Sequence, residues 1–307
     1  MATQRSSADV VAINSTEEIV GIINEAETHH PEIALFPAAA VEKTTYKTLH
    51  RTVAPTAGFR AINAGRTRSR GTIVARTTDL KFLDGSWDID QAAVSGVDWS
   101  DPMVDEASAS VLAVLAAFCR QIWYGTDQDS GGFTGIAQLL DDSDDTLVVD
   151  AAGTTADTAS SVFAVKFGIK HTCLAWGNDG EISQGDIIEQ QLYDGSSDPY
   201  MGYAQAVHGW AGLQMTNYQA VGRICNLTAD AGKGLTDDLV AEILEAFPIG
   251  GEPDYLFMTK RSRRQLQGSR TATNPTGAPA PLPDESHGVP IAVTDSIVNT
   301  EALLTAG

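Results

Sequence analysis

One segment of the sequence resembles a phosphate-binding loop. Ala231-Gly232-Lys233-Gly234 places a lysine among glycines, whose backbone N–H groups could hold a phosphate. In that motif Ser or Thr follows the lysine and a further glycine stands upstream, and both are missing here. We therefore expect a turn ahead of a helix at this place, and not a nucleotide site.

Two acidic segments could bind calcium. The first begins with Asp127 and Asp129, but Gln138 stands at the twelfth position, where a calcium loop needs a bidentate glutamate. The second is the acidic run 141–145, and Ala152 occupies the same position there. Because that glutamate is missing from both, solvated turns explain the two segments better.

Histidine and cysteine residues are the remaining candidate ligands. The six histidines form no H-x-x-x-H or H-E-x-x-H pair, and His29-His30 ends an expected helix before Pro31, where the helix dipole favours them. The three cysteines are far apart and form no C-x-x-C pair, which argues against a disulfide framework or a zinc ribbon. The sequence therefore predicts no metal and no other cofactor.

Nucleophilic catalysis has no recognisable motif either. There is no G-x-S-x-G elbow, and no cysteine stands in an evidently basic setting near a histidine. We predict that the protein is not an enzyme. Residues distant in sequence can still meet in a fold, so an acidic α+β hydrolase with an unrecognised site stays an alternative.

Charge is distributed unevenly along the chain. Forty acidic and 20 basic residues give a net charge of −20, yet the segment 43–81 holds nine of the bases and only one acid, Asp79. Its local charge is +8, so the remainder carries −28. A uniformly acidic chain would repel nucleic acid, but this segregated one has a strongly basic part.

The basic segment also has an unusual pattern. Thr and Arg alternate with Val, Ala and Ile, and Gly58, Gly65 and Gly71 interrupt the run. We predict a long two-stranded ribbon over 43–78 that is too polar to bury itself. The predicted contacts to a second, acidic copy are its basic residues Arg51, Arg60, Arg66, Arg68, Arg70, Arg76 and Lys81. Two alternatives stay open: a loop folded onto its own acidic body, and a nucleic-acid arm, although aromatic residues for base stacking are few.

A long amphipathic helix is the clearest predicted element. Asp101 is a good N-cap, Pro102 suits the first helical position, and Gly125 suits a helix end. The spacing of apolar residues predicts a helix over about 102–124. Its apolar stripe contains Val104, Ala107, Val111, Leu115, Phe118 and Ile122.

Shorter elements surround this helix. We expect a helix from a capping box at Ser15 to the residue before Pro31, and a return hairpin over 80–89 with its turn at 84–86. Thr236 should cap another helix, and a short one is expected over 259–267, followed by a loop over 268–288. The predicted strands of the second half are 162–167, 172–176, 205–210, 221–227, 255–258 and 289–293. These elements predict an α+β fold with mostly antiparallel strands. No apolar run approaches the roughly 20 residues of a membrane helix, and no secretory signal begins the sequence.

Several passages resemble the capsid proteins of one group of short-tailed phages. The helix end Ile122-Trp123-Tyr124-Gly125-Thr126, followed by Gly131-Gly132-Phe133-Thr134-Gly135-Ile136-Ala137, is similar to the passage after the spine helix of that group. The stretches 210–213 and 220–224 resemble its strand pair, and 287–291 with 294–297 resembles its closing strand. With the order of elements, nearly the whole chain resembles the HK97-like major capsid proteins of tailed bacteriophages.

The resemblance implies a structural protein that self-assembles into the icosahedral shell around the phage genome. It implies hexamers and pentamers of this chain, a separate scaffolding protein, a portal protein, and room for a decoration protein. The DNA would be enclosed without sequence-specific binding, no membrane is involved, and assembly would occur in the host cytoplasm before the protein resides in the virion.

The resemblance also implies a division of the chain. The implied parts are an N-terminal arm (1–42), an extended loop (43–98), a peripheral domain with the spine helix (99–160), an axial domain with strands returning to the peripheral domain (161–288), and a C-terminal strand and tail (289–307). A nanocompartment shell is the alternative within the same fold, and a trimeric phage tail or fibre protein is a third alternative.

Overall fold

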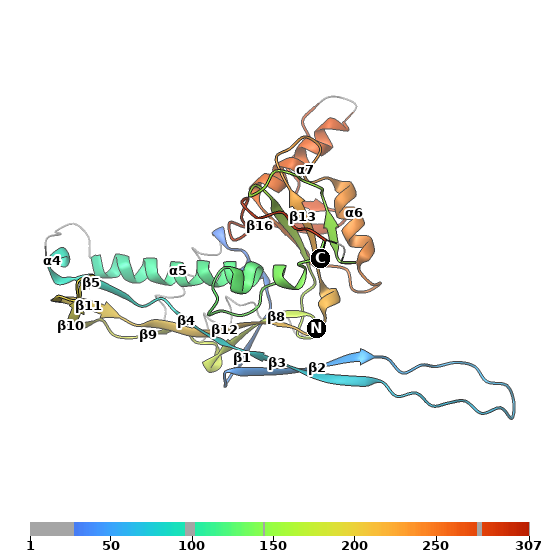
Figure 1. The fold of residues 1–307 in the computed structure, drawn as a ribbon, viewed down its shortest axis with the longest axis horizontal. Coiled ribbons are helices and arrows are strands. Elements are labelled where there is room, and N and C mark those ends of the chain that lie inside the picture. The colour runs from blue at the N-terminus through green and yellow to red at the C-terminus, as the bar shows by residue number, and fades with distance from the viewer. Residues whose placement is uncertain (1–27, 96–101, 144, 275–277, 307) are drawn as a thin grey trace.

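The computed structural model describes residues 28–95, 102–143, 145–274 and 278–306. The helix expected before Pro31 lies mostly outside this part, although its last residues, Thr28 and His29, are helical. The predicted cap Asp101 also lies outside it. Figure 1 shows a long helix over extended strands, a second sheet with its own helices, and a hairpin that projects from the body.

Helix α5 runs from Pro102 to Tyr124, as predicted. Its stripe is buried from Val111 onward, but Val104 is 60% exposed, because the first turns extend past the hydrophobic core. Gly125 ends the helix with φ +60°, and a Cβ there would lie 2.1 Å from the backbone nitrogen of Gly135. Glycine is therefore required at this position by conformation and by space.

Contrary to expectation, α5 is long and apolar enough to cross a membrane, judged by length and composition alone. A core helix of a globular domain has the same composition. Here the buried stripe of α5 belongs to the hydrophobic core, in which Phe118 packs against Trp176 with ring centroids 4.6 Å apart. Core packing therefore explains its apolar character.

Two sheets follow one another along α5 (Figure 1). The first has the order β1-β8-β12-β4, with β9 also paired to β12, and the second has the order β10-β11-β5. The strands of the first are β1 (Ala38–Val41), β4 (Lys81–Asp84), β8 (Thr172–Gly177), β9 (Ser183–Gln184) and β12 (Val207–Met215). The strands of the second are β5 (Trp87–Asp90), β10 (Ile188–Tyr193) and β11 (Pro199–Gln205).

The return hairpin predicted over 80–89 is wrong. Strand β4 pairs with β12 and strand β5 pairs with β11, so the two are not partners of each other. The residue taken for a turn glycine, Gly85, lies against α5 instead, where a Cβ would be 2.0 Å from Val114 Cγ2. Because Gly85 has no side chain, α5 can approach the backbone between β4 and β5 closely.

A six-stranded sheet forms the other half of the body, with the order β15-β16-β14-β7-β13-β6. Its strands are β6 (Val148–Asp150), β7 (Ser160–Val165), β13 (Val221–Leu227), β14 (Tyr255–Met258), β15 (Glu285–Ser286) and β16 (Val289–Val293). Most of these strands were predicted within a few residues, and the α+β class is confirmed. Antiparallel pairs predominate, while β6, β14 and β16 include parallel pairings.

Two helices accompany this sheet. Helix α6 (Asp237–Ala246) begins at Thr236, whose side chain accepts a hydrogen bond from the Leu239 N–H, as predicted. Helix α7 (Lys260–Ala272) continues five residues into the segment expected to be a loop. Arg270 in that extension binds both carboxylate oxygens of Asp237, each at 2.7 Å, and this contact across α6 and α7 stabilises the longer helix.

The predicted ribbon is the antiparallel hairpin of β2 (Thr45–Val53) and β3 (Thr72–Asp79). The remaining elements are the short helices α3 (Glu32–Leu35) and α4 (Gln91–Val94) and the 3-10 turns η1 (Gly125–Asp127), η2 (Ala137–Leu139), η3 (Asn178–Gly180) and η4 (Tyr218–Ala220).

Aromatic side chains join the two halves of the body at the end of α5. Trp123 of α5 stacks on Phe163 of β7, with ring centroids 4.9 Å apart, and also contacts Phe257 of β14. Phe36, which follows α3, meets both Trp123 and Phe257. This shared core fixes the position of α5 relative to the six-stranded sheet.

Candidate functional site

A strongly exposed feature of the described structure is the tip of the β2–β3 hairpin, residues 54–71, which we call the basic tip. Figure 1 shows that the hairpin extends away from the body and that the tip lies beyond the strand ends. Nearly every described residue of the basic tip is exposed. A segment held in this way is available to another molecule and not to its own core.

Four of the seven predicted contact residues lie in the basic tip and are exposed: Arg60, Arg66, Arg68 and Arg70. None of them forms an ion pair within the part of the chain that the structure describes. Arg60 donates to the Ala64 carbonyl and Arg66 to the Gly58 carbonyl, so both bonds stay inside the tip. The four positive charges are therefore left without a described carboxylate partner.

Apolar side chains accompany these arginines. Phe59 is 108% exposed and Ile62 is 93% exposed, as exposed as side chains in an unfolded chain. Burying one such side chain in an interface is worth about 1.5–3 kcal/mol. The basic tip therefore combines charge with apolar surface, which is the composition of a contact surface rather than of a solvated loop.

The base of the hairpin is fixed to the body. Arg76 of β3 is half-buried and donates to the Met215 carbonyl of β12 at 3.2 Å. Gln214 of β12 bridges the two strands, since it accepts from the Thr78 hydroxyl and donates to the Thr48 hydroxyl. These bonds hold the direction in which the basic tip points.

The last two predicted contact residues are not in the tip. Lys81 begins β4 and is exposed on the body. Arg51 lies on β2, and its side chain is outside the described part of the chain. Four of the seven predicted contact residues therefore lie together in the basic tip. Arg76 fixes the hairpin to its own chain, and Lys81 lies at the hairpin base.

The other end of the molecule, at the sheet β10-β11-β5, is acidic. No Lys or Arg occurs in residues 82–119 or 171–222, the two stretches that supply this end. Figure 1 shows this sheet and the hairpin at opposite ends of the long axis. Exposed carboxylates of this acidic end include Asp88, Asp90, Asp186, Glu189, Asp194 and Asp198. The chain thus carries opposite charges at its two ends.

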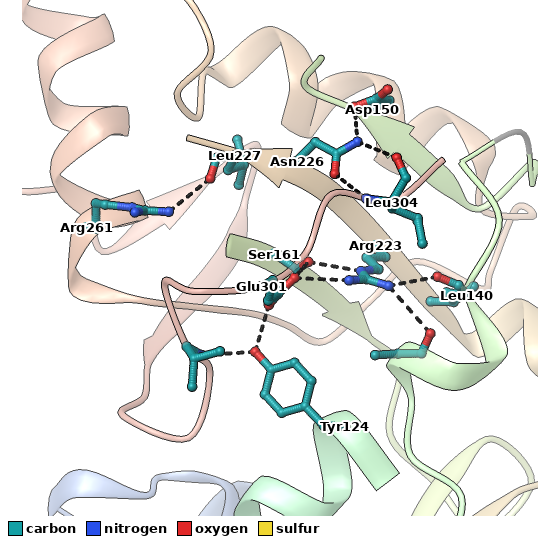
Figure 2. Close-up of polar contacts among 12 residues, drawn as sticks. Tyr124, Leu140, Asp150, Ser161, Arg223, Asn226, Leu227, Arg261, Glu301 and Leu304 are labelled. Carbon is teal, nitrogen blue, oxygen red and sulfur yellow. Dashed lines mark hydrogen bonds and ion pairs between the residues drawn. The ribbon is translucent and has the colours of Figure 1, made fainter. Parts of the chain in front are cut away.

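A buried ion pair fixes the C-terminal segment to the body (Figure 2). Arg223 of β13 binds Glu301 at 3.0 Å, and Glu301 also accepts from Ser161 and from the Tyr124 hydroxyl at the end of α5. Burial, with the nearby Glu301 carboxylate, raises the pKa of the Tyr124 phenol, so it stays a donor. Asn226 pairs with both backbone groups of Leu304. The C-terminal segment is therefore part of the core.

The first candidate calcium segment has a structural role here. The side chain of Asp129 accepts from the Gly131 N–H, and that of Asp127 accepts from Gln138. Gln138 in turn accepts from the backbone N–H groups of Thr126 and Gly135, so it ties the loop after α5 together. These hydrogen bonds hold the loop after α5 in one conformation.

Sequence reasoning missed the acidic end as a site. Its signal is present in the sequence as the absence of any base over 82–119 and 171–222. The two stretches are separated by more than fifty residues, and only the pairing of β5 with β11 brings them together. The net charge of the chain therefore did not indicate that the acidic residues of these two stretches lie together at one end of the molecule.

The sequence and the fold are both similar to those of known proteins. The family model described as Major capsid protein GP7 matches residues 14–305. No curated protein matches the sequence. A chain in the near-atomic structure of bacteriophage Epsilon15 is similar with a TM-score of 0.60 at 17% identity, covering 88% of each chain. At that identity the likeness concerns the fold.

Two further structures are less similar. A chain of the bacteriophage JBD30 capsid has a TM-score of 0.49 at 9% identity, covering 84% of this chain and 88% of that one. A chain of the holo-SrpI encapsulin complex from Synechococcus elongatus has a TM-score of 0.42 at 7% identity, covering 63% and 86%.

The family match decides between the alternatives that the sequence left open. It spans nearly the entire chain, and the family is a structural one, so the hydrolase alternative is not supported. The resemblance to HK97-like capsid proteins is confirmed by the family and by the fold of the Epsilon15 chain. This chain belongs to the Major capsid protein GP7 family and is a shell-forming phage capsid protein with the HK97-like fold.

Proposed function

We propose that neighbouring copies of this capsid protein are joined through opposite charges, with the basic tip of one copy bound to the acidic end of the next. The observation that carries this proposal is the separation of charge along the molecule. The arginines at 54–71 form no ion pair with any described residue, and the stretches that form the acidic end contain no base. Because the two lie at opposite ends, the acidic end of one copy does not reach the tip of the same copy (Figure 1).

Geometry makes the acidic end accessible. Asp88 and Asp90 alternate along β5 with the half-buried Trp87 and Ile89, so the two carboxylates occupy the exposed face of the strand. Asp186 is exposed just before β10 in the same sheet. Guanidinium groups bind such carboxylates through charge-assisted, often bidentate, hydrogen bonds.

Each contact of this kind is weak alone. An exposed ion pair contributes about 0–1 kcal/mol. In a closed ring every copy gives one tip and receives another, so the contacts act together, and the exposed Phe59 and Ile62 add apolar burial. We propose hexamers and pentamers as these rings, with Arg60, Arg66, Arg68 and Arg70 in the tip contact and Arg76 as the anchor of the hairpin.

The domain division is a proposal as well, and the strand pairing supports parts of it. We propose an N-terminal arm (1–42), an extended loop (43–98), a peripheral domain (99–160), an axial domain (161–288) and a C-terminal strand and tail (289–307). Strands β8 and β12 lie inside the axial range but pair with β1 and β4 next to α5, which supports their return to the peripheral domain. Strand β16 pairs with β14, which supports docking of the C-terminal strand on the axial sheet.

The finer partners are also proposals. We infer a separate scaffolding protein, a portal protein and a decoration protein, with assembly in the host cytoplasm. We propose that the shell encloses the DNA without sequence-specific binding. The net charge of −20 supports this, because an acidic shell repels the phosphates of DNA. Co-purification of shells with these proteins from infected cells would test each partner separately.

A charge exchange tests the tip contact. Arg68→Glu with Arg70→Glu should abolish closed shells in negative-stain microscopy, while the unassembled subunit keeps its melting temperature. Adding Asp88→Arg and Asp186→Arg to the same chain should restore shells, since the side chain of neither aspartate forms a described hydrogen bond.

The matched control reverses two exposed bases outside the hairpin, Lys170→Glu with Arg264→Glu, and makes the same change in net charge. This control should still form shells. Shells formed by the tip variant, or a control that fails equally while the four-residue exchange restores nothing, would contradict the proposed contact.

A further inference from the structure

A cluster of potential metal ligands lies where the chain before β1 meets α5. His30, Glu32 and Cys119 each offer one ligand atom, and these three atoms lie within 4.8 Å of one another. Glu32 and Cys119 are fully buried, and His30 is partly exposed. The cluster is distant from the basic tip and takes no part in the assembly contact proposed above.

The carboxylate of Glu32 is only half satisfied. Its Oε1 accepts hydrogen bonds from Trp123 Nε1 at 2.7 Å and from the Thr294 hydroxyl at 2.5 Å. Its Oε2 is buried and has no hydrogen-bond partner within the part of the chain that the structure describes. A buried carboxylate oxygen without a partner is costly, so its presence calls for a ligand or a proton.

The histidine is held as a metal-bound histidine would be. His30 Nδ1 lies 2.8 Å from the Ser296 hydroxyl. A metal-ligating histidine usually donates one ring N–H to such an oxygen, which fixes the ring and leaves the other nitrogen free to bind. Trp123, Thr294 and Ser296 therefore form an outer shell that orients two of the three ligands.

We propose that His30, Glu32 and Cys119 bind one Zn²⁺ ion, which fastens the segment before β1 to the spine helix. Imidazole, carboxylate and thiolate together are a ligand set that zinc accepts, with a water in the fourth position. Binding would release the Cys119 proton to solvent, past the partly exposed His30. The ion would link residues about ninety positions apart and so lock the chain ahead of β1 in place.

The competing account is a proton in place of the metal. Burial raises the pKa of the Glu32 carboxyl, so a protonated Oε2 could also satisfy this pocket without any ion. The two accounts differ in what Glu32→Gln does. A glutamine mimics the protonated acid and preserves stability, but it removes a zinc ligand.

The test uses the full-length, unassembled subunit, freed of metal by a chelator and then given ZnCl₂. We expect uptake of one zinc per chain by elemental analysis and a rise in melting temperature. Co²⁺ in place of Zn²⁺ should give the visible absorption of a thiolate-bound ion. Cys119→Ser and Glu32→Gln should each weaken zinc binding at least tenfold, and Ser296→Ala, a change to the outer shell, should weaken it by about tenfold.

Cys225→Ser is the matched control, because Cys225 is also a buried free cysteine but lies in β13. It should take up zinc like the wild type. If Cys119→Ser does not fold, Glu32→Gln and the cobalt spectrum of the wild type decide. A wild type that takes up no zinc, or a Glu32→Gln variant that takes up as much as the wild type, overturns the proposal.

Discussion

The guanidinium of Arg223 lies 3.0 Å from the carboxylate of Glu301, and the two side chains are only 8% and 6% exposed. The pair joins β13 to the C-terminal segment (Figure 2). We predict that Glu301→Gln lowers the free energy of unfolding by about 3–5 kcal/mol, because it leaves a buried guanidinium without its counter-charge. Urea unfolding of the unassembled subunit measures this loss.

A surface pair gives the matched control. Asp284 pairs with Arg263, but the Asp284 side chain is 86% exposed. Asp284→Asn should therefore lower the free energy of unfolding by less than about 1 kcal/mol. Equal effects of the two substitutions would show that burial of the Arg223–Glu301 pair has no energetic consequence.

A second prediction concerns acid. Hydrogen bonds from Arg270 hold the pKa of Asp237 below its usual value. Since the folded-state pKa is the lower one, the contact stabilises the fold above the unfolded pKa of about 4, and this stability is lost as the pH falls through the folded value. Both side chains are about a third exposed, so we expect about 1 kcal/mol at most at pH 7.

Asp237→Asn isolates that contribution. The difference in free energy of unfolding between wild type and variant should be largest at pH 7 and should shrink as the pH falls below the unfolded pKa of about 4. Chemical unfolding at pH 7, 5 and 3 provides the comparison. A difference that is independent of pH would mean that the charge of Asp237 is not what stabilises the contact between α6 and α7.

A third prediction concerns the glycine that ends α5. Gly125→Ala would place a methyl group 2.1 Å from the Gly135 nitrogen, at a φ of +60°. We expect a loss of more than about 2 kcal/mol in the free energy of unfolding, from backbone strain together with the steric clash. Gly195→Ala is the control, since nothing lies within 4 Å of a Cβ there, and it should change stability by less than about 0.5 kcal/mol.

The long helix and the hairpin could be predicted because their signals are local. The apolar spacing from Val111 to Ile122 fixes one face of α5, and Pro102 and Gly125 mark its ends. In the hairpin, three glycines and alternating polar residues over 43–78 identify a ribbon without a core. Hydrophobic periodicity and turn residues determine such elements without knowledge of the rest of the chain.

The remaining features depend on contacts between distant residues. Gly85 lies in the segment 84–86, whose residues are typical of a turn. In the fold, however, Gly85 packs against Val114 of α5, which is distant in the sequence. The buried ion pair joins Arg223 to Glu301, and neither residue has a local pattern that indicates burial. The acidic end likewise forms only when β5 pairs with β11. Long-range pairing of this kind leaves no periodic trace in the sequence.

The last prediction separates stability from assembly. Phe59 and Ile62 of the basic tip are fully exposed in the single subunit, so replacing both with Asn should leave its melting temperature unchanged. If the tip is buried on a neighbouring copy, the same change should raise the protein concentration needed for assembly at least tenfold, since losing about 1.4 kcal/mol of contact energy is enough for that. Light scattering across a dilution series measures this threshold. Phe59→Leu with Ile62→Leu keeps the apolar surface and should assemble near the wild-type threshold; if the Asn variant does so too, the apolar part of the tip makes no contact in the shell.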